Sequence, residues 1–336
     1  MRVILAGSST TVEHLLYVRG TSNLGDRMRV PAPCFPIAAT LSWGAMFPIA
    51  AHALPHVDAF NITAIRYIAA SLAFIAILLV VEGVGALRTE GRAGELFLLG
   101  SLGFAGFNLL AYLGLAFTEP QNAAVIVPLM PLVTVLARWR RDGIRPSALT
   151  LVAIVVALIG VLLVVTGGHP SQLRGSGGDL LIILAVIGWV RYTMGAAAFP
   201  HWSPLRYTTV TAALGTVTII VATVIADAVG WQSVPALADV AAVWREIAFL
   251  VAFGAVVAVL AWNHSVRLIG PANTSLFIML VPVTTFVIQI ARGYEPGAAE
   301  LVGAGFVVMS LLVANVAGRS NGTTDVPSLV PAGSRS

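Results

Sequence analysis

The sequence has little charge. Only 10% of its 336 residues are Asp, Glu, Lys or Arg, whereas about 25% of a soluble globular protein is charged. Apolar residues make up 58% of the chain, which excludes an ordinary water-exposed surface and excludes disorder as the main state. This composition is typical of an all-α polytopic membrane protein.

Lysine is absent, and all 19 basic residues are arginine. We attach no function to the missing lysine. A net charge of +4 would suggest nucleic acid in a soluble protein, but in a membrane protein cationic residues mark the cytoplasmic side, so no nucleic-acid partner is expected. The single cysteine, Cys34, cannot form an internal disulfide and leaves the redox compartment undetermined.

Acidic residues are missing from the middle of every predicted helix, as the positions of Glu82, Asp227 and Glu300 illustrate. Without a midplane carboxylate, the usual acidic proton relay of a membrane protein is absent. The chain also has no phosphate-binding glycine motif, Cys/His metal pattern or converging catalytic group. We therefore expect no cofactor, no metal site and no enzymatic activity.

Ten apolar runs are long enough to cross a bilayer. At about 19–24 residues each, they would span about 28–36 Å as helices, which covers a hydrocarbon core of about 30 Å. Pro120 separates the third run from the fourth. The predicted transmembrane helices cover residues 35–53, 62–83, 95–117, 120–138, 147–167, 179–198, 206–229, 246–268, 271–291 and 298–316.

The arginines predict the orientation. With the N-terminus inside, cytoplasmic segments hold fourteen arginines and outer loops hold three, while Arg66 and Arg191 fall inside helices. The positive-inside rule then places both termini in the cytoplasm, as expected for a protein of a bacterial inner membrane. Residues 1–33 form the N-terminal tail and residues 318–336 a disordered cytoplasmic tail. Residues 1–27 could equally be an extension before a true start at Met28, and both readings stay open.

The two halves of the chain are similar to each other. The block from Pro120 to Pro131 matches the block from Pro271 to Pro282 at a constant offset of 151 residues, and both blocks carry Asn at their third position. The earlier pairs Trp43 with Trp189 and Arg66-Tyr67 with Arg206-Tyr207 follow the same order.

This order predicts two five-helix repeats, residues 34–168 and residues 178–317. Because each repeat has an odd number of helices, the second must cross the membrane upside down relative to the first. Inverted repeats place a binding site at their interface, near the bilayer midplane.

These features resemble the drug/metabolite transporter superfamily, in its ten-helix EamA-like family. The resemblance covers about residues 34–317 and is carried by Trp43-Gly44, Arg66, the Asn122/Pro131 and Asn273/Pro282 blocks, and Gly293-Tyr294-Glu295-Pro296. It implies a secondary transporter, commonly an exporter of amino acids or other small metabolites. The loop from Arg141 to Pro146 lacks the expected glutamate, and Arg191 is not part of the family pattern.

Arg191 is the first candidate for substrate binding. It follows Gly188-Trp189-Val190 about twelve residues into its predicted helix, so its charge should face the interior or a wet cavity. A fixed cation there would suit a carboxylate, phosphate or sulfonate, although bonds to backbone carbonyls or a reach to the cytoplasmic surface would also satisfy it. Arg66 lies only about one turn inside its predicted helix, and snorkelling to the outer surface is favoured for it.

The other candidates are aromatic or polar residues within helices. Each could line the cavity or simply serve packing and interhelical hydrogen bonds. The substrate-binding candidates are Trp43, Trp189, Tyr192, Asn108, Asn263, His264 and Gln289. Four further residues are expected to kink or cap helices: Pro131, Pro282, Asn122 and Asn273.

The sequence therefore favours a secondary transporter working by alternating access, with a small molecule and the lipid bilayer as partners. Because no predicted helix carries a midplane carboxylate, as an exporter of lipophilic cations commonly does, anionic or zwitterionic cargo is favoured. Two alternatives are a non-transporting membrane scaffold or sensor and, with less support, an intramembrane lipid-modifying enzyme. A coupling proton or ion, a homodimeric state, the direction of transport and the identity of the substrate are left open.

Overall fold

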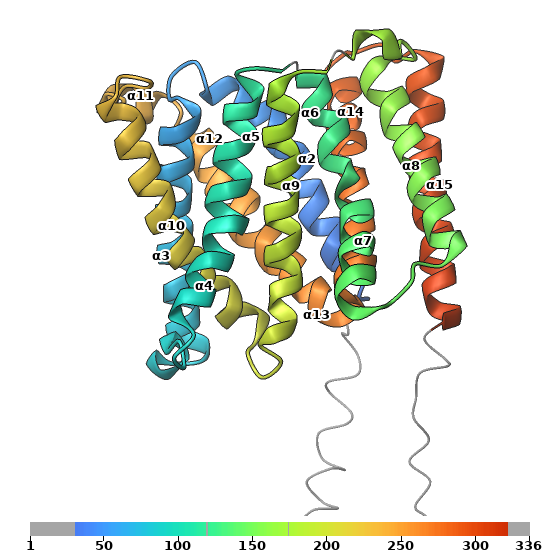
Figure 1. Cartoon of the computed structure of the whole chain (residues 1–336). Helices are drawn as coiled ribbons and strands as arrows, with labels where there is room; N and C mark the ends of the chain where they lie inside the picture. Colours follow the sequence, from blue (N-terminus) through green and yellow to red (C-terminus); the bar gives the residue numbers. More distant parts are fainter. Residues whose placement is uncertain (1–30, 119, 174, 322–336) are drawn as a thin grey trace, which may run out of the picture.

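A computed structural model describes residues 31–118, 120–173 and 175–321. Over these ranges the chain forms helices and no strands, packed side by side as one bundle (Figure 1). The long elements, in chain order, are α2 (Cys34–Ala53), α3 (Ala59–Val81), α4 (Ala93–Gly100), α5 (Phe107–Leu115), α6 (Pro120–Ile126), α7 (Met130–Asp142), α8 (Ala148–Thr166), α9 (Gly177–Gly195), α10 (Pro204–Ala228), α12 (Trp244–Phe249), α13 (Ala258–Leu276), α14 (Leu280–Ala291) and α15 (Ala298–Asn321), with the short α11 (Leu237–Ala242) between α10 and α12.

The predicted polytopic all-helical fold is confirmed. In the described part of the chain, eight helical stretches are long and apolar enough to cross a membrane, and Ala298–Val313 is a shorter apolar helix. One stretch, Trp244–Ala291, holds two predicted helices, because the chain stays helical on both sides of Gly270. Gly270 adopts φ +78°, a conformation that glycine tolerates, and Pro271 follows it. The ten predicted crossings are thus all present as apolar helices.

Short polar residues and glycines set several helix ends. The Asp58 carboxylate accepts hydrogen bonds from two backbone N–H groups at the start of α3, and the Ser203 hydroxyl accepts one at the start of α10. At their other ends, α7 and α8 stop at Gly143 and Gly167, both left-handed. Because Asp58 starts α3 at Ala59, three residues before the predicted start, the residues of this helix lie deeper than the sequence suggested.

The same irregularities recur in both halves. A π-helical segment, Ser101–Gly106, joins α4 to α5, and another, Leu250–Val257, joins α12 to α13. A 3₁₀ turn, Val127–Leu129, joins α6 to α7, and a second, Phe277–Met279, joins α13 to α14. Pro131 and Pro282 follow these turns and lack the N–H that would continue the α-helical ladder.

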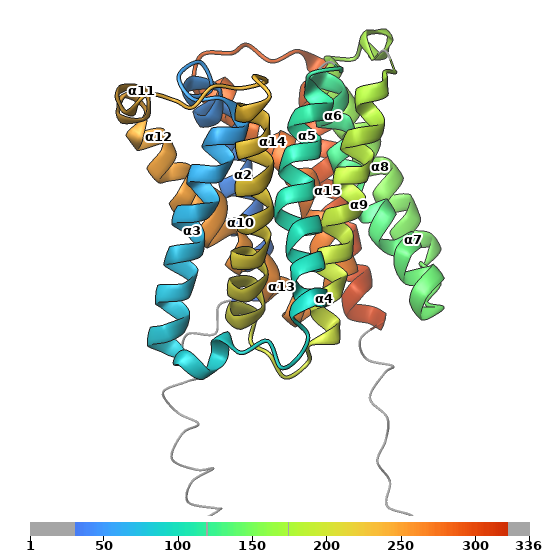
Figure 2. The same cartoon turned by 60° about the vertical axis from the view of Figure 1, so that its left-hand side comes forward.

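Two helices of the first half pack against the helices that occupy the same place in the order of the second half. The second helix of each half forms the pair α3 and α10, and the fifth forms the pair α8 and α15 (Figure 2). Where α3 meets α10, the hydroxyls of Ser71 and Thr216 are 2.8 Å apart. Arg66 is the eighth residue of α3 but Arg206 is the third of α10, so the pairing of Arg66 with Arg206 suggested by the sequence is out of register. The division into repeats 34–168 and 178–317 stays a prediction.

The two predicted tails fall mostly outside the described residues. Residues 1–30 and 322–336 are not described. The helix α15 continues to Asn321, so the first four residues of the predicted tail 318–336 are helical and that part of the prediction is wrong.

Small residues let α8 and α15 approach closely. A methyl group added at Gly303 would lie 2.5 Å from the Gly160 carbonyl oxygen, whereas one added at Gly305 would meet nothing within 4 Å. Gly303→Ala should therefore destabilise the protein by about 1–3 kcal/mol through overpacking. Gly305→Ala, two residues along the same helix, should leave the melting temperature unchanged or raise it, since alanine favours helix. Thermal unfolding of both variants in detergent checks this, and equal melting temperatures would contradict it.

Candidate functional site

A cavity of about 70 Å³ lies between helices of the two halves of the chain. At about 10–15 Å³ for each water molecule, it has room for about five to seven waters or a few non-hydrogen atoms of a ligand. Both halves of the chain contribute to its wall. The lining residues are Trp43, Met46, Phe47, Arg66, Tyr67, Phe107, Asn108, Val127, Met130, Trp189, Gly254, Val259, Ile278 and Val281.

Arg66 is the charged residue of this wall. It is 4% exposed, eight residues into α3, and its guanidinium donates to Asn108 Oδ1 at 2.5 Å and to Met46 Sδ at 3.2 Å. The Tyr67 ring lies beneath it, with the guanidinium carbon 4.6 Å from the ring centre. The expectation that Arg66 snorkels to the outer surface is therefore wrong, because α3 starts earlier than predicted and buries this position.

The predicted aromatic pair lies at the cavity. Trp43 and Trp189 are in edge-to-face contact, with ring centres 5.7 Å apart, and both line the wall. Trp43 Nε1 donates to the Gly254 carbonyl at 3.0 Å. Trp189 Nε1 is buried and has no hydrogen-bond partner among the described residues. The two tryptophans, one from each half of the chain, therefore differ in the hydrogen bonding of their indole N–H groups.

The prolines shape the same wall. The carbonyls of Val127 and Ile278 lie four residues before Pro131 and Pro282 and would each bond to the N–H that proline lacks. Both residues line the cavity. The N–H of the residue after each 3₁₀ turn bonds to these carbonyls instead.

A second set of buried polar side chains, apart from the cavity wall, joins α9, α10 and α13. The end of the bundle drawn at the bottom of Figure 1 is called the lower end hereafter. Asn263 Nδ2 donates to the Tyr192 hydroxyl at 2.6 Å and to Thr208 Oγ1 at 2.8 Å, and Trp262 Nε1 donates to Thr193 Oγ1 at 3.3 Å. Tyr192 and Asn263, predicted to bind substrate, therefore belong to this second set and do not line the cavity. Asn108, by contrast, does line it.

Arg191 does not face the interior. Its side chain is exposed, and it lies four residues before the end of α9 at Gly195. Residues two apart on an α-helix point about 200° apart, so a helix that turns Trp189 toward the cavity turns Arg191 away from it. The expected interior position is wrong, and a lower-end, lipid- or water-facing position replaces it.

The remaining candidates lie elsewhere. His264 is half-buried with its ring centre 4.4 Å from that of Phe35, and Gln289 is exposed near the end of α14. Asn122 is buried and donates to Asp179 at 3.1 Å, which ties α6 to α9. Asn273 is exposed and donates to the Ile269 carbonyl within its own kinked helix. None of these residues is part of the cavity wall.

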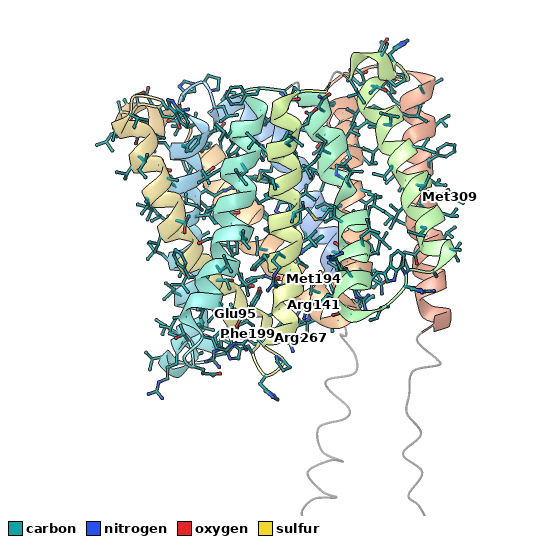
Figure 3. All side chains as sticks on the ribbon, in the orientation of Figure 1. Glu95, Arg141, Met194, Phe199, Arg267 and Met309 are labelled. Carbon is teal, nitrogen blue, oxygen red and sulfur yellow. The ribbon has the colours of Figure 1, made fainter. Side chains whose placement is uncertain are left out.

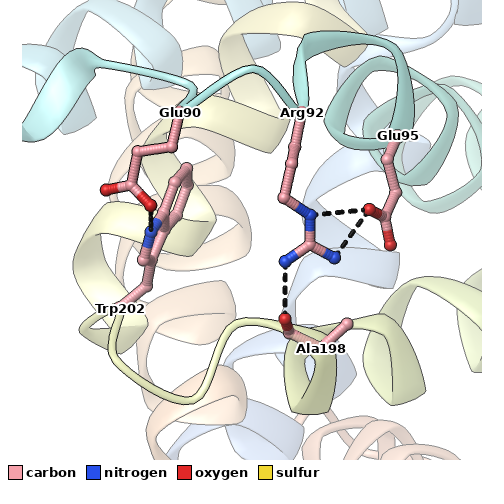
Figure 4. Close-up of polar contacts among 5 residues, drawn as sticks. All are labelled: Glu90, Arg92, Glu95, Ala198 and Trp202. Carbon is pink, nitrogen blue, oxygen red and sulfur yellow. Dashed lines mark hydrogen bonds and ion pairs between the residues drawn. The ribbon is translucent and has the colours of Figure 1, made fainter.

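The loop before α4 contacts the loop before α10 and the start of α10 at the lower end. The residues of this contact are Glu90, Arg92, Phe199, Trp202 and Arg206, which we call the latch. Figure 4 shows Glu90, Arg92 and Trp202 of the latch. Trp202 Nε1 donates to Glu90 Oε2 at 3.1 Å, and Arg206 forms an ion pair with Glu90 at 2.7 Å. Arg92 donates to the Ala198 carbonyl at 2.7 Å and lies over the Phe199 ring. The latch therefore connects the first half of the chain to the second.

The Trp202 hydrogen bond, and then the Arg206 ion pair, lower the pKa of the Glu90 carboxyl below its usual value of 4.5. Because that pKa is lowered in the folded protein, the contribution of this contact is present at neutral pH and is lost as pH falls through the lowered pKa.

Further arginines bind carbonyls at the same end. Arg267 donates to the Pro200 carbonyl at 2.6 Å, and Arg141 donates to the Met194 carbonyl at 3.5 Å. Figure 3 shows both side chains there with Phe199. The carbonyls at the end of α9 and in the loop that follows it thus accept hydrogen bonds from side chains.

Sequence reasoning missed Met46, Phe47, Tyr67, Phe107 and Met130, which also line the cavity. They are apolar or weakly polar, so no charge pattern marked them. For Arg66 a signal existed: Asp58, followed by an apolar run, is a typical helix start and places Arg66 about two turns inside. Among the described residues, no group of three His, Cys, Asp or Glu side chains could hold a metal ion.

The comparisons with known proteins agree with this architecture. The model of the EamA-like transporter family matches twice, over residues 31–166 and 176–316. The chain is 35% identical over 287 residues to YrdR of Bacillus subtilis (83% of this chain, 89% of YrdR), which is described as an uncharacterized transporter. It is 33% identical to YyaM of the same organism, also described as an uncharacterized transporter (81% of this chain, 89% of YyaM).

The fold has a counterpart among solved structures. A crystal structure of another protein superimposes with a TM-score of 0.70 at 20% identity, covering 88% of this chain and 99% of that one. This likeness concerns the fold alone.

The two tryptophans should respond differently to the same substitution. Trp43→Phe removes the donor to the Gly254 carbonyl and should lower stability by about 0.5–1.5 kcal/mol. Both variants replace a bicyclic indole with a smaller phenyl ring and lose packing, but Trp189→Phe removes no hydrogen bond to a described residue, so it should lower the melting temperature less than Trp43→Phe does. Thermal unfolding of the two variants in detergent provides the test; a larger loss for Trp189→Phe would contradict the assigned bonding.

Proposed function

Because the chain belongs to the EamA-like transporter family, we propose that it is a secondary exporter of small anionic or zwitterionic metabolites. The family makes it an integral membrane transporter of small molecules. Amino acids and related carboxylates are the cargo we favour. Transport proceeds by alternating access, with the two halves rocking around the central cavity.

One observation carries this proposal: the cavity is built by both halves of the chain. Arg66 and Asn108 come from the first half, and Trp189, Gly254 and Ile278 from the second. A site at such an interface is exposed to one side or the other when the halves move relative to each other. A scaffold or sensor would have no need of a cavity between its halves.

The charge of the wall supports the choice of cargo. Arg66 is the one ionised side chain among the described lining residues, and a buried cation favours an anionic ligand over a cationic one. The residue proposed to bind the anion is therefore Arg66, in place of Arg191.

The lower end is the cytoplasmic end in this proposal. Arg138, Arg140, Arg141, Arg206 and Arg267 lie at helix ends or beside loops on that side, as the positive-inside rule requires of the cytoplasmic face. Both termini are then cytoplasmic, and the membrane is the bacterial inner membrane. Export requires cargo to enter from the latch side.

Purified wild-type protein in liposomes should exchange metabolites. We expect counterflow of labelled amino acids and short carboxylates into loaded vesicles, with no counterflow of quaternary ammonium compounds. Imposing a pH gradient tests coupling to protons, and comparing inside-out with right-side-out vesicles tests export. Empty liposomes are the control. An absence of flux for every compound in the panel would argue for the scaffold alternative.

Opening of the latch should be required for transport. In a Cys34→Ser background, cysteines replacing Glu90 and Trp202 can be joined by a short cleavable crosslinker, since these side chains are in hydrogen-bond contact. We expect crosslinking to reduce flux at least tenfold and reductant to restore it. Each single-cysteine variant treated with the same reagent is the control. Full flux through the crosslinked protein would show that the lower end does not open.

A further inference from the structure

We propose that the Arg66 guanidinium and the Trp189 indole N–H bind the carboxylate of a small substrate whose short apolar body lies against the surrounding aromatic rings. This inference rests on the proposed function, because it names a chemical class of cargo for the same cavity. It is carried by two buried hydrogen-bond donors on residues that line the cavity, for which no described protein group is an acceptor.

The Arg66 guanidinium has more N–H donors than it has acceptors among the described residues. A guanidinium carries five N–H groups in a fixed fork. In the described structure it donates to one strong acceptor, Asn108 Oδ1, and to one weak acceptor, the Met46 thioether. Its Nε is buried and has no hydrogen-bond partner among the described residues. A buried donor left in this way costs free energy that a ligand oxygen would recover.

The charge of Arg66 is also uncompensated by any described carboxylate. The ion pairs found in the described ranges involve other basic residues, and none involves Arg66. Contact with the Tyr67 ring offsets part of the cost of burying this cation. A bound anion would offset much more, because opposite charges attract strongly where water is excluded.

Trp189 supplies a second donor on the same wall. Its Nε1 can only donate, it is buried, and no described group accepts its hydrogen. The side chain is 4% exposed and lines the cavity together with Arg66. Trp43, which lines the same cavity, has its N–H bonded to the Gly254 carbonyl. Of these two tryptophans, Trp189 is therefore the one whose indole donor has no described acceptor.

Two N–H donors without acceptors favour a ligand group that accepts hydrogen bonds and donates none. An ionised carboxylate has no donor and offers about four lone-pair positions on two oxygens. Placed directly against Arg66 and Trp189, an amide or an ammonium group would add N–H donors where acceptors are lacking, so the ammonium group of an amino acid would have to lie elsewhere in the cavity. The rest of the wall is mostly apolar, as Phe107, Val127 and Ile278 illustrate, so a polyanion would find too few donors.

The volume of the cavity limits the size of the apolar part of the ligand. A volume of about 70 Å³ suits a short branched chain better than a fused ring system. Isovalerate is therefore a suitable probe, and it has a neutral and a cationic counterpart of nearly the same shape, isovaleramide and isoamylamine.

Calorimetric titration of the full-length protein in detergent provides the test. We expect isovalerate to bind at least tenfold more tightly than isovaleramide, and isoamylamine not to bind. Equal affinity for the acid and the amide would overturn the carboxylate subsite, and so would an absence of isovalerate binding to the wild type.

Three variants locate the subsite. Arg66→Gln should weaken isovalerate binding at least tenfold and leave isovaleramide binding nearly unchanged, while Arg66→Lys, which keeps the charge without the fork, should lose less. Trp189→Phe should weaken isovalerate binding about threefold to tenfold. Arg191→Gln makes the same chemical change on an exposed arginine of α9 and is the matched control, with wild-type affinity expected.

The outcomes separate this inference from the proposed function. Circular dichroism and gel filtration identify any variant that fails to fold, and Trp189→Phe tests the subsite if Arg66→Gln is such a variant. Wild-type isovalerate affinity in folded Arg66→Gln or Trp189→Phe would overturn the subsite. If the wild type still exchanged metabolites in liposomes, the transporter assignment would stand without it. An absence of all exchange would instead overturn the proposed function.

Discussion

Every backbone N–H and C=O in the hydrocarbon core must find a partner inside the protein, and this requirement governs the whole structure. It makes the described chain helical and makes each departure from α-helical geometry informative. Among the departures in the described residues, two π-helical segments and two 3₁₀ turns lie at similar places in the two halves. Gly254, Val127 and Ile278, which line the cavity, lie within them. Irregular backbone from both halves thus contributes to the cavity wall.

The sequence predicted the helices well because membrane helices are specified by length and hydropathy, both of which can be read locally. It predicted the position of Trp43 and Trp189 because the repeat relates them. It failed for Arg191 because burial depends on which way a helix is rotated. Trp189 and Arg191 are two residues apart and cannot share a face, a constraint that would have excluded one of them.

The failure for Arg66 had a different cause. Its depth depended on where α3 begins, and an error of three residues changes depth by about 4.5 Å. That distance separates a side chain that reaches the interface from one that is enclosed by other helices. Its contacts with Met46 and Asn108, in turn, depend on packing between three helices and could not be derived from local sequence.

The close packing of α8 and α15 has a consequence for the evolution of such a protein. Neither helix contributes a residue to the cavity wall among the described residues, yet the two are in backbone contact at Gly160 and Gly303. The closest contact of this pair and the residues that line the cavity are therefore at separate positions. On the proposed function, substitutions around the cavity could change the cargo while this outer pair is kept.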